Sequence, residues 1–214
     1  MELLIFDLDG TLIDSQLDLA HAVNAMREHM GMAVLPHETI WSYVGNGAPV
    51  LVRKALGGTA PEEDVQRGLG YFLDYYWHHL LDNTVLYPGV REALDAFHAR
   101  SIAMAVLTNK PIRFSEAIVD GLGLRQYFFR VYGGNSFEQK KPDPYGIQRL
   151  MEERNAAAHR TLMIGDSAID IRTARNAGVQ ACGVTYGFQP ETLVTEPPDI
   201  LLDNLAGLVP IVLG

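Results

Sequence analysis

The chain has 214 residues, and its 17 basic and 26 acidic side chains give a formal net charge of −9. Hydrophobic residues at 48% and charged residues at 20% are typical of a globular protein and exclude a disordered one. At about 150 residues per domain, this length allows one domain with a large insertion or two small domains. The acidic balance, without a long Lys/Arg run, argues against nucleic acid or an anionic membrane as a partner.

Cysteine content and hydropathy narrow the cellular setting. The single cysteine, Cys182, excludes an intramolecular disulfide and a cysteine-based zinc site, and its apolar neighbours predict a buried, inert thiol. The acidic N-terminal segment lacks the basic start of a secretory signal. No run approaches 18 apolar residues, so no transmembrane helix is expected. We therefore expect a cytoplasmic protein without a membrane partner.

Short apolar runs alternate with helical patterns along most of the chain. Such runs are typical of strands buried on both faces of a parallel sheet. Asp143 before a proline suggests a helix N-cap, and Gly178 a helix end. The alternation predicts a doubly wound, Rossmann-like α/β sheet. The expected strands are residues 3–6, 102–107, 129–132, 161–164, 180–184 and, more weakly, 200–202; the expected helices are 89–100, 113–121, 143–154 and 168–177.

Residues 15–83 interrupt this alternation with helical periodicity and no convincing strand. Ser15, with Asp18 three residues later, resembles a capping arrangement at the start of the first helix. Residues of one apolar helical face then follow at steps of three and four. We therefore expect an α/β core of residues 1–14 plus 84–214, interrupted by an all-helical domain of residues 15–83. The apolar positions are Leu19, Val23, Met26 and Met30 in an early helix, and Val65, Leu69, Phe72, Tyr76 and Leu80 in a later one.

Two carboxylates directly follow the first predicted strand, in Asp7-Leu8-Asp9-Gly10-Thr11. Because residues i and i+2 leaving a strand can point the same way, Asp7 and Asp9 are expected to face one pocket. Ligand sites of parallel sheets form at the carboxyl ends of strands. Two close carboxylates suit one ionised nucleophile or metal ligand and one acid/base with a raised pKa.

Four motifs, in order, resemble those of the haloacid dehalogenase superfamily of aspartate-nucleophile phosphohydrolases. Residues Phe6 to Ser15 are similar to the first motif, and Leu107 to Lys110 to the second. Lys141-Pro142-Asp143-Pro144 resembles the third motif, and Ile164 to Asp170 the fourth. The resemblance thus spans the core of the chain and implies a hydrolase fold with an inserted cap domain.

This resemblance implies an aspartyl-phosphate mechanism with Mg²⁺ as cofactor. Asp7 is the implied nucleophile, and Asp9 the implied acid for the leaving alkoxide and base for the attacking water. Mg²⁺ is expected on the Asp7 side chain, the Asp9 backbone carbonyl and the Asp166 side chain. A hard cation suits this oxygen set and screens the attacking carboxylate from phosphate.

Five further residues complete the implied site. The Thr108 hydroxyl and the Asn109 backbone N–H are expected to bind phosphoryl oxygens, and Lys141 to neutralise charge on the nucleophile and substrate. Asp170 lies one helical turn beyond the fourth-motif metal ligand and, with Ser167, is expected to support the metal site or Lys141 from behind.

A glycine-containing loop in the insert is the candidate substrate-selecting segment. Closely spaced glycines at Gly45 and Gly47, around Asn46, allow backbone N–H groups to approach an anion. A tight interhelical turn remains an alternative interpretation of this spacing. Val44 to Ala48 is similar to the cap loop of phosphoglycolate phosphatases, and Val184 to Gly187 also resembles those enzymes.

Other polar residues of the insert give no firm assignment. Arg53 is either a carboxylate ligand or a surface arginine. His78 and His79 diverge by about 100° on a helix, so they are expected to be structural or exposed rather than to share a metal.

The sequence therefore predicts a Mg²⁺-dependent phosphomonoesterase acting on a small phosphorylated metabolite, with 2-phosphoglycolate as the favoured substrate. A phosphomutase and a pyrophosphate or nucleotide phosphatase remain open. A haloacid dehalogenase is disfavoured by Asp9, which that chemistry does not need, and a catalytically silent phosphate-binding protein by the complete motif set. Monomer and homodimer are not distinguished.

Overall fold

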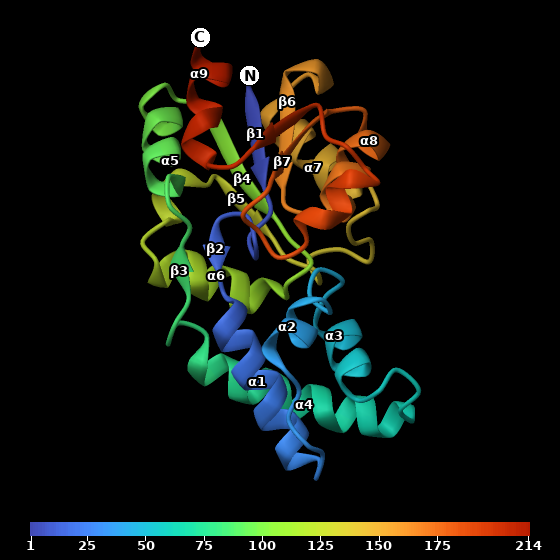
Figure 1. Ribbon diagram of the computed structural model, residues 1–214. Helices are drawn as coiled ribbons and strands as arrows, with labels where there is room; N and C mark the ends of the chain where they lie inside the picture. The colour runs from blue at the N-terminus through green and yellow to red at the C-terminus, as the bar shows by residue number, and fades with distance from the viewer. The chain divides into compact units, whose positions relative to one another are not determined.

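The computed structural model describes all 214 residues, which divide into two compact units. The core unit comprises Met1–Asp14 and Leu86–Gly214, and the helical unit comprises Ser15–Val85 (Figure 1). Two short strands, β2 (Ile13–Asp14) and β3 (Val85–Leu86), pair where the chain passes between the units.

The core unit is built on a six-stranded sheet in the order β5-β4-β1-β6-β7-β8, with every neighbouring pair parallel. The predicted doubly wound parallel sheet is confirmed. The central strands are apolar and buried on both faces, as the continuous apolar runs require. The strands are β1 (Leu3–Phe6), β4 (Ala103–Leu107), β5 (Arg130–Tyr132), β6 (Thr161–Gly165), β7 (Gln180–Val184) and β8 (Ile200–Leu202).

Helices cover both faces of this sheet (Figure 1). Helix α7 packs on β4 and β1 and α8 on β6 and β7, whereas α5 packs with α9. The α-helices of the core are α5 (Val90–Ala99), α6 (Ile112–Gly121), α7 (Tyr145–Arg154), α8 (Ala168–Ala177) and α9 (Leu208–Leu213). Short 3-10 helices are η1 (Arg125–Tyr127), η2 (Ala158–Arg160), η3 (Pro190–Val194) and η4 (Leu205–Gly207).

The two predicted helix signals fared differently. Helix α8 ends at Gly178 in the left-handed conformation, as expected. The N-cap predicted for α7, Asp143, was wrong by one residue, because Pro144 is the N-cap and the helix begins at Tyr145. The Asp143 side chain still accepts a hydrogen bond from the Tyr145 N–H at 2.9 Å, so it satisfies the first N–H group of the helix from the residue before the N-cap.

Strand register aligns the ends of three neighbouring strands. Strand β1 lies between β4 and β6, and Phe6 is paired with Val106 on one side and Ile164 on the other. The residues that follow these strands, Asp7, Thr108 and Asp166, therefore leave the sheet at one edge. That edge is the carboxyl end where parallel sheets form ligand sites.

The helical unit contains α1 (Gln16–His29), α2 (His37–Trp41), α3 (Ala48–Ala55) and α4 (Glu62–His79). Helix α1 packs on α4 through the predicted apolar faces, since Val23, Met26, Phe72 and Tyr76 are all buried. Tertiary packing of these faces, more than intrinsic propensity, stabilises helices of this length.

The capping role predicted for Ser15 and Asp18 was wrong. The Ser15 side chain makes no capping hydrogen bond to α1. Asp18 is instead buried and accepts hydrogen bonds from the backbone N–H groups of Asn83 and Thr84, from the Asn83 amide and from the Thr84 hydroxyl, at 2.7–3.0 Å. A carboxylate at the start of the helical unit thus fixes the segment at its end.

Two further expectations concern membrane-spanning helices and the single cysteine. None of the helices has both the length and the apolar character needed to cross a membrane. Cys182 is fully buried, and burial raises the pKa of its thiol to about 12. The thiol is thus kept protonated near neutral pH, in line with the predicted inert cysteine.

Replacing Asp18 is expected to destabilise the helical unit. Asp18→Asn turns one acceptor oxygen into a donor that faces other donors, which is expected to cost roughly 2–4 kcal/mol of unfolding free energy. Urea unfolding followed by circular dichroism measures this loss. The control is Asp74→Asn, which makes the same charge change at an exposed position of α4 and is expected to change stability by no more than about 0.5 kcal/mol. Equal losses in both variants would show that the Asp18 hydrogen bonds contribute no special stability.

Candidate active site

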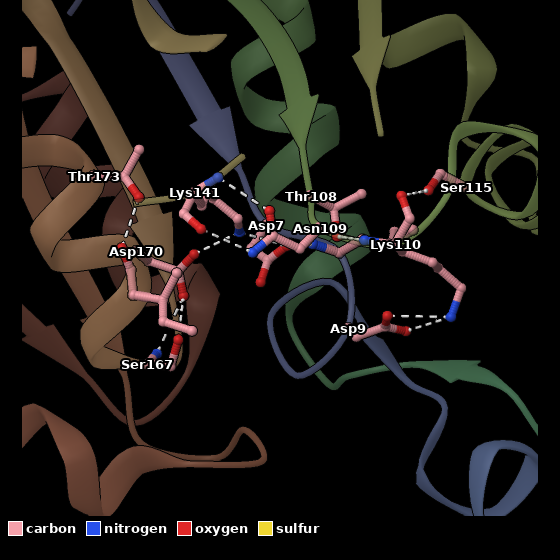
Figure 2. Close-up of polar contacts among 12 residues, drawn as sticks. Asp7, Asp9, Thr108, Asn109, Lys110, Ser115, Lys141, Ser167, Asp170 and Thr173 are labelled. Carbon is pink, nitrogen blue, oxygen red and sulfur yellow. Dashed lines mark hydrogen bonds and ion pairs between the residues drawn. The ribbon is translucent and has the colours of Figure 1, made fainter. Parts of the chain in front are cut away.

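A buried lysine joins two carboxylates at the carboxyl edge of the sheet (Figure 2). Lys141 Nζ lies 2.9 Å from Asp7 Oδ1 and 2.6 Å from Asp170 Oδ1. Asp7 directly follows β1, Lys141 precedes α7, and Asp170 lies in the first turn of α8. The structure therefore brings together three residues that are 29 to 163 positions apart in the sequence, all of them buried.

Burial and charge pull in opposite directions in this cluster. Burial raises the pKa of Asp7 to about 6, with Lys141 opposing the shift and Asp170 adding to it. Burial disfavours the charged form of Lys141, but the carboxylates of Asp170 and Asp7 outweigh it, and the pKa of Lys141 is raised above its usual value. Lys141 thus stays a cation, and it is the protein's own counter-charge for Asp7.

The Asp170 carboxylate is held in place by hydrogen bonds from the N-cap residue of its own helix. Ser167 is the N-cap of α8, and its N–H and hydroxyl donate to Asp170 Oδ2 at 3.2 and 2.8 Å, while Oδ1 accepts from Lys141. A Cβ on Gly165 would lie 2.2 Å from the Asp170 Cβ, so only glycine fits at the end of β6. Ser167 and Gly165 therefore fix the carboxylate that orients Lys141.

Asp166 is the most enclosed of the candidate metal ligands. Its Oδ2 accepts hydrogen bonds from the backbone N–H groups of Phe188 at 2.6 Å and Gln189 at 3.3 Å. A Cβ on Gly10 would lie 2.3 Å from Asp166 Oδ2, and one on Gly187 would lie 2.2 Å from the Asp166 Cβ. Burial, together with the nearby acids of the cluster, raises the pKa of Asp166 well above its usual value.

The acidic cluster fits a hard divalent cation. Asp7, Asp166 and Asp170 each present a carboxylate oxygen within 4.8 Å of the others, and all three are buried. Only Lys141 is paired with this trio, so the cluster has an excess of buried negative charge that a cation of charge two balances. The predicted ligands Asp7 and Asp166 lie in this cluster, whereas Asp9 was expected to contribute only its backbone carbonyl.

The second motif places Thr108 and Asn109 beside this cluster. Thr108 is buried at the end of β4, and its hydroxyl accepts the Lys110 N–H at 3.2 Å. The Asn109 side chain forms a two-way bridge to the Lys141 backbone, with its amide donating to the Lys141 carbonyl and its Oδ1 accepting the Lys141 N–H, both at 3.1 Å. Asn109 thus positions Lys141, a role that sequence reasoning, which considered only its backbone N–H, missed.

A second lysine was also missed. Lys110 Nζ lies 3.0 and 3.1 Å from the two oxygens of Asp9, and the lysine side chain is only 4% exposed (Figure 2). The one sequence signal was its place directly after the strand-end pair Thr108-Asn109, where side chains reach the same edge as Asp9. The structure therefore pairs Asp7 and Asp9 with different lysines.

The loop after β7 contacts the site in a way that the sequence analysis did not predict. Val184 to Gly187 served only as a likeness to other enzymes, but Gly187 lets this loop pack against Asp166 and Gly10. Tyr186 donates its hydroxyl hydrogen bond to the Thr11 carbonyl at 2.9 Å. The loop therefore links the first motif, through the Tyr186 side chain, to the fourth motif, through the backbone N–H groups that contact Asp166.

The remaining candidate residues lie in the helical unit. Gly45 and Gly47 have φ of 104° and 85°, and Gly47 is the N-cap of α3, so two glycines with positive φ flank Asn46 directly before that helix. Arg53 pairs with Glu62 on the exposed surface, as a surface arginine does.

Each histidine of the adjacent pair has a local partner. His78 Nδ1 contacts the Asp74 carbonyl at 2.9 Å, and His79 Nδ1 lies 2.7 Å from the Asp82 carboxylate. The two imidazoles therefore make separate local contacts, one to the backbone of α4 and one to Asp82.

Comparison with known proteins places the chain in a family. The family model for haloacid dehalogenase-like hydrolases matches residues 4–184. This match covers most of the chain and includes every motif residue of the cluster. The chain belongs to the haloacid dehalogenase-like hydrolase family, and within it the chain is a phosphatase-type hydrolase.

Individual relatives carry a more specific name. The chain is 40% identical to a phosphoglycolate phosphatase of Pseudomonas fluorescens, over 97% of this chain and 78% of the relative. It is 38% identical to a phosphoglycolate phosphatase of Vibrio parahaemolyticus, over 99% and 96% of the two chains. A crystal structure described as a predicted phosphoglycolate phosphatase from Haemophilus somnus matches with a TM-score of 0.94 and 30% identity, over 99% and 97% of the chains.

Removing one buried carboxylate tests whether the acidic cluster binds a cation. At about 100 times its Kd, Mg²⁺ is expected to stabilise the parent by about 2.7 kcal/mol, a rise of roughly 5–10 °C in Tm. Asp166→Asn is expected to lose most of this rise, while its amide oxygen still accepts the Phe188 N–H. Calorimetry with Mg²⁺ and with EDTA measures both states.

The matched control is Asp203→Asn, at an exposed position beyond β8, which is expected to keep the full Mg²⁺ effect. Without metal, Asp166→Asn is expected to be at least as stable as the parent, since a buried charge is gone. An unchanged Mg²⁺ effect in Asp166→Asn would place the cation elsewhere.

Proposed function

We propose that the chain is a Mg²⁺-dependent phosphomonoesterase that hydrolyses 2-phosphoglycolate to glycolate and phosphate through an aspartyl-phosphate on Asp7. The observation that carries this proposal is the buried Asp7 carboxylate, which is paired with Lys141 and belongs to an acidic cluster suited to a cation. The names of the most similar relatives support phosphoglycolate as the substrate.

The positions of the contacts on Asp7 suit a nucleophile. Leu8 N–H donates to Asp7 Oδ1 at 2.7 Å, and Lys141 Nζ contacts the same oxygen. Both contacts fix the carboxylate through one oxygen, and Oδ2 is the atom proposed to attack phosphorus. Holding the nucleophile in a single orientation converts binding energy into rate, since phosphoryl transfer depends mainly on positioning and charge stabilisation.

The proposed reaction has two displacements at phosphorus. Asp7 Oδ2 forms a bond to phosphorus while the bond to the glycolate oxygen breaks, and Asp9 gives a proton to that oxygen. Asp9 then takes a proton from water as the water oxygen attacks phosphorus, which releases phosphate and restores the Asp7 carboxylate. Lys141 and Thr108 stabilise charge on the phosphoryl oxygens during both steps. When bound, Mg²⁺ would be held by Asp7 and Asp166 with the Asp9 carbonyl, and would supply charge neutralisation between nucleophile and phosphate.

The helical unit is proposed to act as a cap that selects the leaving group. Gly45, Asn46 and Gly47 directly precede α3, where first-turn N–H groups lack intrahelical acceptors and suit an anion. Support for this role comes from the likeness of the loop to phosphoglycolate phosphatases.

Substitution of the nucleophile tests the proposal. Purified protein with Mg²⁺ is expected to release phosphate from 2-phosphoglycolate with a higher kcat/KM than from other small phosphates. Asp7→Asn is expected to reduce kcat by at least about 10³-fold, and EDTA to abolish activity reversibly. A phosphate-release assay across small phosphomonoesters, a nucleotide and pyrophosphate measures both effects.

Asp203→Asn again serves as the control and is expected to keep parental activity. Full activity of Asp7→Asn contradicts the mechanism. Faster turnover of a nucleotide or pyrophosphate than of phosphoglycolate contradicts the substrate assignment.

A further inference from the structure

Lys110 is a buried cation that the proposed phosphoryl chemistry does not use. Lysine side chains normally keep the ammonium group in water, because burying a charge is costly unless it is paired. Here the Lys110 side chain is 4% exposed, and both oxygens of Asp9 lie within 3.1 Å of its Nζ. Asp9 is itself only 12% exposed at the side chain, so the pair is set into the protein rather than on its surface.

The backbone around Lys110 is held from several sides. Its N–H donates to the Thr108 hydroxyl at 3.2 Å, and its carbonyl accepts the Gly134 N–H at 2.8 Å and the Ser115 hydroxyl at 3.3 Å. A Cβ on Gly133 would lie 2.7 Å from the Lys110 carbonyl oxygen, so the loop after β5 approaches this backbone as only glycine allows. These contacts fix the backbone position from which the Lys110 side chain extends.

The two lysines of the site lie on different carboxylates. Lys141 contacts Asp7 and Asp170, on the nucleophile side, whereas Lys110 contacts Asp9 (Figure 2). In the proposed mechanism Asp9 gives its proton to the leaving oxygen, so Asp9 contacts the leaving group. Because Lys110 contacts Asp9, its ammonium lies on the leaving-group side of the site. The site thus provides one cation for the phosphoryl group and another for the group attached to it.

We propose that Lys110 determines specificity by binding a second anionic group on the leaving group. An ammonium has three N–H donors and can contact two carboxylates at once, so Lys110 can hold Asp9 and a substrate carboxylate together. The substrate class is therefore phosphomonoesters with a carboxylate close to the ester oxygen. This inference rests on the proposed function and gives a reason for its substrate: a carboxylate on the leaving group adds a second charged contact to the Lys110 ammonium, beside Asp9, which a leaving group without an anion does not make.

Binding measurements separate this role from a purely structural one. In the Asp7→Asn background, which binds but does not turn over, titration calorimetry with Mg²⁺ gives Kd for 2-phosphoglycolate and for ethyl phosphate, which has the same two-carbon leaving group without the carboxylate. Lys110→Met is expected to weaken phosphoglycolate binding by about tenfold or more, and ethyl phosphate binding by no more than about twofold. The control is Lys140→Met, which removes an exposed lysine near the same site and is expected to change neither affinity.

Two further variants guard against a folding defect. Lys110→Gln keeps a polar side chain of similar length without the charge and is expected to lose the same preference, whereas Lys110→Arg is expected to retain most of it. In the parent background, the ratio of kcat/KM for phosphoglycolate over ethyl phosphate is expected to fall by the same factor in Lys110→Met.

The outcomes distinguish this inference from the proposed function. Equal weakening of both ligands, or no weakening of either, overturns the role of Lys110, and equal weakening would assign Lys110 to positioning Asp9 instead. Unchanged phosphate release by Asp7→Asn in an otherwise parental chain overturns the proposed mechanism itself, whatever Lys110 does.

Discussion

The structure depends on one electrostatic constraint, the burial of several carboxylates at the carboxyl edge of a single sheet. Asp7, Asp166 and Asp170 each present a carboxylate oxygen within 4.8 Å of the others, and burial, together with repulsion between these acids, raises the pKa values of Asp7 and Asp166. Such a cluster is stable only with positive charge in its midst. Lys141 supplies part of that charge, and a divalent cation is proposed to supply the rest.

The fold meets this constraint by holding the carboxylates and Lys141 in place through neighbouring backbone and side-chain groups. Parallel strand register brings the ends of β1, β4 and β6 to one edge, and glycines at positions 10, 165 and 187 leave room for the carboxylates. Ser167 holds Asp170, and Asn109 holds the backbone of Lys141. With Lys110 included, the two lysines and a divalent cation carry as much positive charge as four ionised carboxylates, those of Asp7, Asp9, Asp166 and Asp170, carry negative charge. The acidic net charge of the whole chain therefore says little about the ligand.

Much of this arrangement was predictable from the sequence because it is local. Continuous apolar runs gave strands within one or two residues of their observed bounds, and each motif follows a strand or begins a helix. The features that could not be predicted depend on contacts between distant segments. In the sequence Asp18 resembles part of a helix cap, whereas in the structure it accepts hydrogen bonds from Asn83 and Thr84, which lie 65 and 66 residues away. Lys110 follows a strand-end pair, which places it at the right edge of the sheet, but the sequence does not show that Asp9 is its partner.

The central claim is that Asp7 carries the phosphoryl group during turnover. The most direct test mixes excess enzyme with 2-phosphoglycolate labelled in its phosphoryl group, quenches with acid within milliseconds, and locates the label by peptide mapping. The account predicts that label appears on the peptide containing Asp7 before phosphate is released, and that Asp7→Asn forms none. Phosphate release with no protein-bound label, or label on another residue, would contradict it.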